Sequence, residues 1–311
     1  WFRPGTDVGY YKNQHARASG TGSFFTLSFT VTFPANDDVC YLAYHYPYTH
    51  TDLRDYLDRM EADGERSKCV RRRTLCQTLA GNDCDVLTIT QFESGGSAPD
   101  IRRRPAILLS ARVHPGETNA SWMMKGIIDY LTGPSLDAKI LRDNFVFKIV
   151  PMLNPDGVIC GNYRCSLAGV DLNRQWLDPS RKMHPPVYHT KQMIKRFSED
   201  REVVMYCDLH GHSRHKNIFM YGCAPDRTTP FAGSDPLDER IFPRLLFRNS
   251  DNFAYKDCSF KVQKAKESTA RVVYWRQFRI QNSYTMEATY CGASQGQYIG
   301  RHVSQAHLQE R

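Results

Sequence analysis

The chain has 311 residues, which is long enough for one large domain with a full hydrophobic core and a small companion. Its composition is 41% hydrophobic and 24% charged, as in ordinary globular proteins. No apolar stretch approaches the roughly 18 residues that a membrane helix needs, so we expect no membrane span and no membrane partner.

The charge balance favours acidic partners. The formal net charge is +8, and basic runs occur at Arg71–Arg73 and Arg102–Arg104. The simplest interpretation of either run alone is solvated surface. No helix-turn-helix, RNP-type or zinc-finger pattern accompanies the charge, so we expect no nucleic-acid partner.

The ten cysteines are scattered without short repeated spacings, and several, such as Cys207 in "VVMYCDLHG", lie in strand-like apolar runs. This pattern predicts reduced and mostly buried thiols, which favours a cytoplasmic location.

The N-terminal part has the composition of β structure. The run 24–33 is rich in aromatic and β-branched residues, and a second such run, 39–46, follows a turn-like "PANDD". We therefore predict a small antiparallel β unit over residues 1–47. Helical spacing then begins in "PYTHTDLRDYLDRM", behind threonine and aspartate capping candidates, so the second domain is expected to span 48–311.

Strand-like and helix-like segments alternate beyond residue 47. This alternation predicts an α/β domain whose sheet is covered by helices on both faces. The predicted strands are 86–91, 105–113, 145–152, 203–209 and 283–288, and the predicted helices are 119–132, 186–200 and 238–253.

A histidine and a glutamate, His114 and Glu117, follow the apolar run "PAILLSARV", where a buried strand should end and a helix begin. Open α/β sheets bind ligands at this edge, and an imidazole and a carboxylate three residues apart can reach one divalent ion. Such a pair alone occurs often by chance. A catalytic zinc needs a third ligand, for which His210 at the end of the strand in "CDLHGH" is the best candidate, with His212 and His215 as competitors.

Two further features could support hydrolysis. Glu287 ends another strand-like segment and could act as a general base, although a surface salt bridge is the alternative interpretation. The loop after 145–152 contains Arg164, Asn173 and Arg174, which could bind an acidic group, or could simply form a turn with surface ion pairs.

Five motifs in order, "HPGE", "LNPDGV", "DLNRQW", "CDLHGH" and "YTMEA", together resemble the zinc metallocarboxypeptidases, and specifically their cytosolic carboxypeptidase branch. The resemblance runs from about residue 40 to the end. It implies a mixed, mostly parallel sheet with helices on both faces, preceded by part of an antiparallel β-sandwich. It also implies one Zn²⁺ per chain, bound by His114, Glu117 and His210, with Glu287 as the base that activates water.

The same resemblance implies roles for four further residues. Asn173 and Arg174 would hold the terminal carboxylate of the substrate, and Arg164 would stabilise the oxyanion of the scissile carbonyl. Arg271 lies where the family reads the substrate side chain, and a cation there suits glutamate; a structural arginine is the alternative.

The branch removes glutamates from tubulin tails and other acidic C-termini, so the expected partners are acidic tails of tubulin or microtubules. The expected location is the cytoplasm, at microtubules or cilia.

Two rival functions remain, a zinc acylase of the aspartoacylase or desuccinylase type and a catalytically silent module that binds acidic tails. The chain departs from digestive relatives at Gly116, where they have arginine, and lacks a clear match for their lid tyrosine. Loops 92–104 and 223–237 are expected to shape the pocket.

Overall fold

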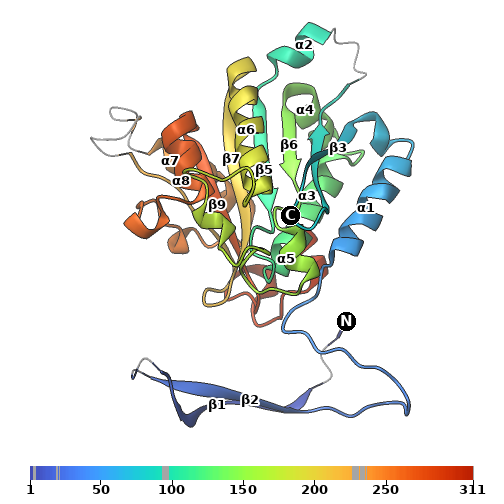
Figure 1. Ribbon diagram of the computed structural model, residues 1–311, viewed down its shortest axis with the longest axis vertical. Helices are drawn as coiled ribbons and strands as arrows, with labels where there is room; N and C mark the ends of the chain where they lie inside the picture. The colour runs from blue at the N-terminus through green and yellow to red at the C-terminus, as the bar shows by residue number, and fades with distance from the viewer. Residues whose placement is uncertain are drawn as a thin grey trace. The chain divides into compact units, whose positions relative to one another are not determined.

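The computed structural model describes residues 1–2, 5–18, 20, 22–92, 98–225, 231, 235 and 237–310 (Figure 1). The chain divides into two compact units, Trp1–Tyr46 and Pro47–Arg311. The loops 92–104 and 223–237 lie partly outside the described residues. Among the helices that are described, none combines the length and apolar character that crossing a bilayer requires.

The first unit contains an antiparallel pair of strands, β1 (Thr6–Ala16) and β2 (Ser23–Thr30). The predicted strand 24–33 corresponds to β2, but residues 39–46 form no strand, so that prediction was wrong. The partner of β2 is β1, whose sequence "TDVGYYKNQHA" mixes polar residues and glycine with aromatic ones. A strand needs a partner, and strand propensity does not say which segment supplies it.

The second unit is built on a mixed sheet in the order β3-β4-β6-β5-β7-β9-β8. Its four central strands, β6, β5, β7 and β9, run parallel, and β4 and β8 pair antiparallel to their neighbours. The predicted mixed, mostly parallel sheet is confirmed. Within the described residues the strands are β3 (Val70–Gln77), β4 (Asp83–Ile89), β5 (Ala106–Ala111), β6 (Val146–Val150), β7 (Val203–His212), β8 (Ile218–Tyr221) and β9 (Asn282–Thr289).

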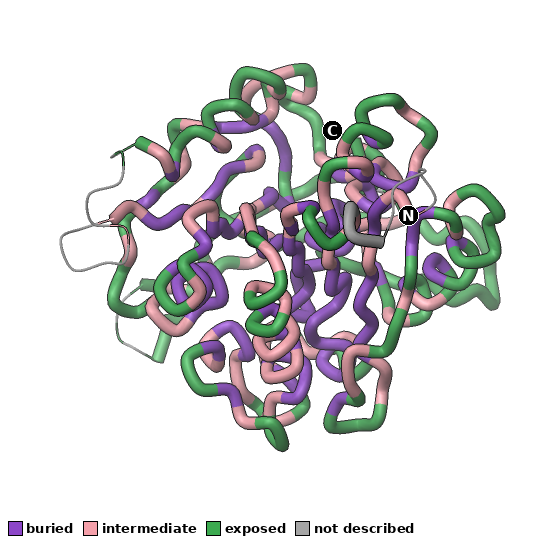
Figure 2. The backbone as a smooth tube through the Cα atoms, turned by 90° about the horizontal axis from the view of Figure 1, so that it is seen from above, coloured by how far each residue is buried: buried purple, intermediate pink, exposed green. Residues whose placement is uncertain are grey.

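Helices cover both faces of this sheet because successive strand residues point to opposite sides. In β7, Tyr206 belongs to an apolar cluster with residues of α6 (Pro185–Asp200) and α8 (Ala270–Phe278), whereas Leu209 belongs to another with residues of α1 (His50–Ala62) and α3 (Thr118–Leu131). Figure 2 shows that the buried backbone gathers in the middle of the molecule. The described α-helices are α1 (His50–Ala62), α2 (Ala98–Arg103), α3 (Thr118–Leu131), α4 (Leu136–Asn144), α5 (Pro155–Ile159), α6 (Pro185–Asp200), α7 (Asp238–Asn249), α8 (Ala270–Phe278) and α9 (Gln305–Gln309).

The two arginine runs are not simply solvated surface, which corrects the interpretation from sequence. The side chain of Arg72 is only 10% exposed and forms ion pairs with Asp58, Glu61 and Asp85. Arg104 is buried and donates to the carbonyl oxygens of Gln91 and Arg142. Both arginines therefore link elements of the fold, since a buried cation requires such partners.

All ten cysteines are free thiols, as predicted, and four of them are buried. Cys40, Cys160 and Cys291 are exposed, so the expectation of mostly buried thiols was wrong for these three.

Candidate metal and catalytic centre

The parallel central strands bring four chain segments to one edge of the sheet. His114 and Glu117 follow β5, the loop 151–174 follows β6, His210 lies in β7 and Glu287 lies in β9. His210 and Glu287 are register partners across β7 and β9, so the strand pairing itself sets them side by side. This is the edge at which open α/β sheets bind their ligands.

The turn after β5 is held in an unusual conformation. Arg112 has a φ of 58°, in the left-handed region that residues other than glycine rarely adopt. Its guanidinium donates to the Pro115 carbonyl oxygen at 2.8 Å and to the Ser121 hydroxyl at 2.8 Å, which ties the turn to α3. The Gly116 N–H donates to the Tyr163 carbonyl oxygen at 2.7 Å, and a Cβ on Gly116 would lie 2.6 Å from that same oxygen. Only glycine fits there without displacement of the loop.

His114, Glu117 and His210 form a buried group whose ligand atoms lie within 4.8 Å of one another. The two carboxylate oxygens of Glu117 each lie 2.8 Å from a histidine Nδ1, one on His114 and one on His210. Two imidazoles and a carboxylate are the donor set of many catalytic zinc sites. The residues present therefore fit a zinc ion.

A second layer of carboxylates orients both histidines. Nε2 of His114 lies 3.0 Å from Asp171, and Nε2 of His210 lies 2.8 Å from Asp208. Asp208 in turn accepts from Ser110 at 2.7 Å. A carboxylate at Nε2 keeps the proton there, which leaves Nδ1 as the metal-binding atom. The sequence reasoning missed Asp171 and Asp208, although both lie within motifs it had singled out.

Interactions with neighbouring charges change the pKa values of His114, Glu117 and His210 in the metal-free chain. Burial alone would lower the pKa of His114 and His210, but hydrogen bonds and attraction from the nearby carboxylates outweigh it and raise both. Burial alone would raise the pKa of Glu117, but His210 and His114 hold it well below its ordinary value.

Glu287 has a different environment from Glu117. Burial raises its pKa to about 7, and the charge of Glu117 adds to the rise, whereas the two histidines oppose it. Its Oε2 atom is buried and has no hydrogen-bond partner among the described residues. A carboxyl group that titrates near neutrality and lies beside the ligand group has the properties of a general base. The alternative of a surface salt bridge does not fit this burial.

The loop after β6 brings Arg164, Asn173 and Arg174 together around one carboxylate. Asp171 accepts from Arg164 at 2.7 and 2.9 Å and lies 3.9 Å from Arg174. The Asn173 N–H donates to Asp171 at 2.9 Å, and its side chain lies 3.4 Å from His210. Asp171 thus connects the predicted anion-binding residues to the ligand His114.

Arg271 stands apart from this loop. It is buried in α8, where its Nη1 donates to the Gly222 carbonyl oxygen and contacts the Cys223 sulfur at 3.1 Å. Its Nε has no hydrogen-bond partner among the described residues. Burial raises the pKa of Tyr221, the charge of Glu287 adds to the rise and the charge of Arg271 opposes it, so both charges act on this phenol. Sequence reasoning did not single out Tyr221.

The candidate ligands His212 and His215 are not part of the metal group. His212 is the last residue of β7, and its Nδ1 accepts the backbone N–H groups of Arg214 and His215. The Nδ1 atom of His212 therefore stabilises the turn after β7 through hydrogen bonds.

Comparison with known proteins identifies the family of this fold and site. The protein family described as "Zinc carboxypeptidase" matches residues 53–302 of this chain. Cytosolic carboxypeptidase 1 of Xenopus laevis is 48% identical to this chain, covering all of it and 27% of the relative. Cytosolic carboxypeptidase 3 of Bos taurus is 49% identical, covering 99% of this chain and 30% of the relative. The chain thus spans less than a third of the length of these relatives.

Solved structures agree on the fold. A metallo-carboxypeptidase from Pseudomonas aeruginosa superposes with a TM-score of 0.71 at 24% identity, over 86% of this chain and 66% of that one. The predicted enzyme class, a metallocarboxypeptidase of the hydrolases, and zinc as the family's metal are confirmed by these comparisons. Since the family description covers most of the chain and the relatives are nearly half identical to it, the protein belongs to the zinc carboxypeptidase family.

Proposed function

We propose that this chain is a catalytic region that hydrolyses the C-terminal peptide bond of glutamate-rich protein tails, releasing glutamate. The single observation that carries the proposal is the buried convergence of His114, Glu117 and His210 beside a Glu287 carboxyl oxygen that has no hydrogen-bond partner among the described residues. A metal-binding group next to a base with a pKa of about 7 is what hydrolysis by activated water requires.

Zinc held by these three side chains would lower the pKa of a water molecule and polarise a carbonyl group. Glu287 would take the proton of the attacking water on its carboxylate and return it to the leaving amine. A base with a pKa near neutrality can do both, because the proton is neither too tightly nor too loosely held. No covalent intermediate is needed.

The cationic loop would bind the two anionic parts of the substrate. Asn173 and Arg174 would hold the terminal carboxylate, and Arg164 would stabilise the negative charge that develops on the scissile carbonyl oxygen. Asp171 keeps Arg164 in place through hydrogen bonds at 2.7 and 2.9 Å, so little reordering is needed when substrate binds.

Arg271 supports glutamate as the residue released. Its guanidinium is buried and forms no ion pair with the described residues, and its Nε has no hydrogen-bond partner among them. A buried cation without a carboxylate is costly unless a ligand supplies one. A glutamate side chain in the pocket would do so.

The net charge of +8 supports acidic tails as substrates, and tubulin tails are the proposed partners. The relatives are named cytosolic carboxypeptidases, which supports a cytoplasmic location, with microtubules or cilia as the proposed site of action.

The test is mass spectrometry of a glutamate-tailed peptide incubated with zinc-loaded protein, beside Glu287→Gln as the inactive control. Arg271→Gln separates side-chain recognition from the chemistry. We expect stepwise loss of C-terminal glutamate with the parent protein, none with Glu287→Gln, and weakened preference for glutamate over leucine with Arg271→Gln. An untouched peptide, or release of leucine in preference to glutamate by the parent, would contradict the proposal.

A further inference from the structure

A second pocket lies beside the edge strand β8, outside the groups described above. It has a volume of about 1000 Å³ and contains none of the predicted site residues. The segment that forms one wall runs beside β8 and its extension: the Ser259 N–H donates to the Met220 carbonyl oxygen at 3.1 Å, and the Gly222 N–H donates to that of Ser259 at 3.0 Å. The Ala224 N–H donates to the Phe260 carbonyl oxygen at 2.7 Å. The pocket therefore lies within the second unit of the chain.

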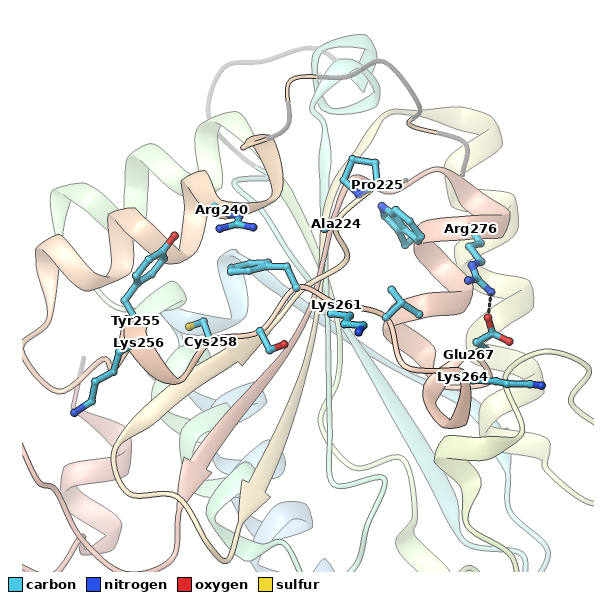
Figure 3. Close-up of a pocket in the computed structure, with 14 residues that line it drawn as sticks. Ala224, Pro225, Arg240, Tyr255, Lys256, Cys258, Lys261, Lys264, Glu267 and Arg276 are labelled. Carbon is cyan, nitrogen blue, oxygen red and sulfur yellow. Dashed lines mark hydrogen bonds and ion pairs between the residues drawn. The ribbon is translucent and has the colours of Figure 1, made fainter. Parts of the chain in front are cut away.

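The lining of this pocket combines cationic and aromatic side chains. Figure 3 shows Lys256 at one end, Lys264 at the other, and Lys261 between them. All three lysines are exposed, whereas the lining residues Phe260 and Trp275 are buried. The other charged lining residues are partnered, Arg276 by Glu267 at 2.9 Å and Arg240 by Glu239 at 3.1 Å.

The lysine row has no acidic counterpart of its own. None of the three lysines forms an ion pair within the part of the chain that the structure describes. Among the described residues that line the pocket, Glu267 is the one acidic side chain, and it already forms an ion pair with Arg276. A hollow with unpaired cations is a natural binding place for a carboxylate-rich chain.

The chain segment that carries Lys264 also approaches the catalytic groups. Lys264 begins a short 3₁₀ helix, Lys264–Lys266, so at most about 7 Å separates the Cα atoms of Lys264 and Lys266. Burial lowers the pKa of Lys266, Arg174 and Arg164 lower it further, and Glu287 and Asp171 oppose the effect. The geometry agrees, because farther along the same segment the Ala270 N–H donates to the side-chain oxygen of Asn173 at 3.1 Å, while Lys264 lines the pocket.

We propose that this pocket, the lysine pocket, is defined by Lys256, Lys261 and Lys264 and binds the acidic segment of the substrate that precedes the bond being cut. The occupant is a glutamate-rich peptide, held by charge along the lysine row while its C-terminus lies at the catalytic centre. This inference rests on the proposed deglutamylation, but binding to the pocket is measured separately from turnover.

The experiment uses a fluorescent glutamate decamer whose C-terminus is amidated, so that it has no terminal carboxylate for Asn173 and Arg174. Its affinity is measured by fluorescence anisotropy at two salt concentrations with the zinc-loaded Glu287→Gln chain. The test variant adds Lys256→Glu, Lys261→Glu and Lys264→Glu. The matched control instead adds Lys139→Glu, Lys182→Glu and Lys195→Glu, three exposed lysines outside the pocket, so the net charge change is identical.

We expect the test variant to lose at least tenfold in affinity and the control to stay within about threefold, with binding that weakens at higher salt. On the active chain, the same lysine changes should raise KM for a long glutamate tail while leaving kcat/KM for a blocked glutamyl dipeptide unchanged. Equal losses in test and control variants would overturn the lysine pocket, as would a DNA duplex of equal charge competing as strongly as the peptide. If glutamate is never released but the decamer binds through the three lysines, the proposed function fails while the pocket stands.

Discussion

Replacing Glu287 with glutamine is expected to stabilise the metal-free protein above neutral pH while abolishing hydrolysis. Burial raises the pKa of Glu287 to about 7 from an ordinary value of 4.5, so the folded state resists ionisation of this carboxyl group. One pKa unit corresponds to about 1.4 kcal/mol, which makes the cost of ionised Glu287 about 3 kcal/mol.

The pH window follows from the direction of this change. Because the folded pKa is above the unfolded one, the folded state keeps a proton between about pH 4.5 and 7 that the unfolded state has lost. The free energy of unfolding of the parent therefore falls as pH rises through that window. Glutamine carries no charge, so the variant should match the parent near pH 5 and exceed it by about 3 kcal/mol at pH 8.

Urea unfolding of zinc-free parent and variant at both pH values measures this difference. Glu199→Gln, at an exposed position in α6, is the matched control and should change little at either pH. Saturating zinc should shrink the difference, because a nearby cation favours the ionised carboxylate. A Glu287→Gln variant that is no more stable than the parent at pH 8, or equally stabilised at pH 5, would refute the reasoning.

Three further predictions concern the metal group. Gly116→Ala would place a methyl group 2.6 Å from the Tyr163 carbonyl oxygen, so the turn that carries His114 and Glu117 must move. Zinc affinity, measured by competition with a chelating dye, should therefore fall. An unchanged affinity would contradict this role of Gly116. Asp208→Asn removes the carboxylate that lies 2.8 Å from His210 and should weaken zinc binding roughly 10–100-fold in the same assay, whereas the exposed Asp200→Asn should not. The pKa of His210 is raised, and its Nδ1 must be free of a proton to bind metal, so zinc affinity should rise with pH. Calorimetry in buffers of different ionisation enthalpy should detect the release of this proton. If no proton is released, His210 is not protonated in the metal-free chain.

The candidate site residues could be predicted from sequence largely because each lies near or just after the carboxyl end of a strand of the central sheet. His114, His210 and Glu287 come from runs whose apolar character identified them as buried strands, and parallel strands carry their C-terminal ends to one edge. The edge strands were harder to predict. β3, with the sequence "VRRRTLCQ", contains three arginines, and only its pairing with β4 and the ion pairs of Arg72 make it a strand.

The sequence by itself determined the family, the α/β class and the identity of the candidate ligands and base, because motif order and hydrophobic alternation are local properties of the chain. The tertiary structure decided the electrostatic environment of each carboxylate. Glu117 and Glu287 are the same residue type, yet one lies between two histidines that depress its pKa, and the other has a raised pKa and a buried oxygen with no hydrogen-bond partner among the described residues. Asp171, Asp208 and the lysine pocket likewise depend on neighbours that are distant in sequence, and electrostatic environments of this kind exist only once those segments have packed together.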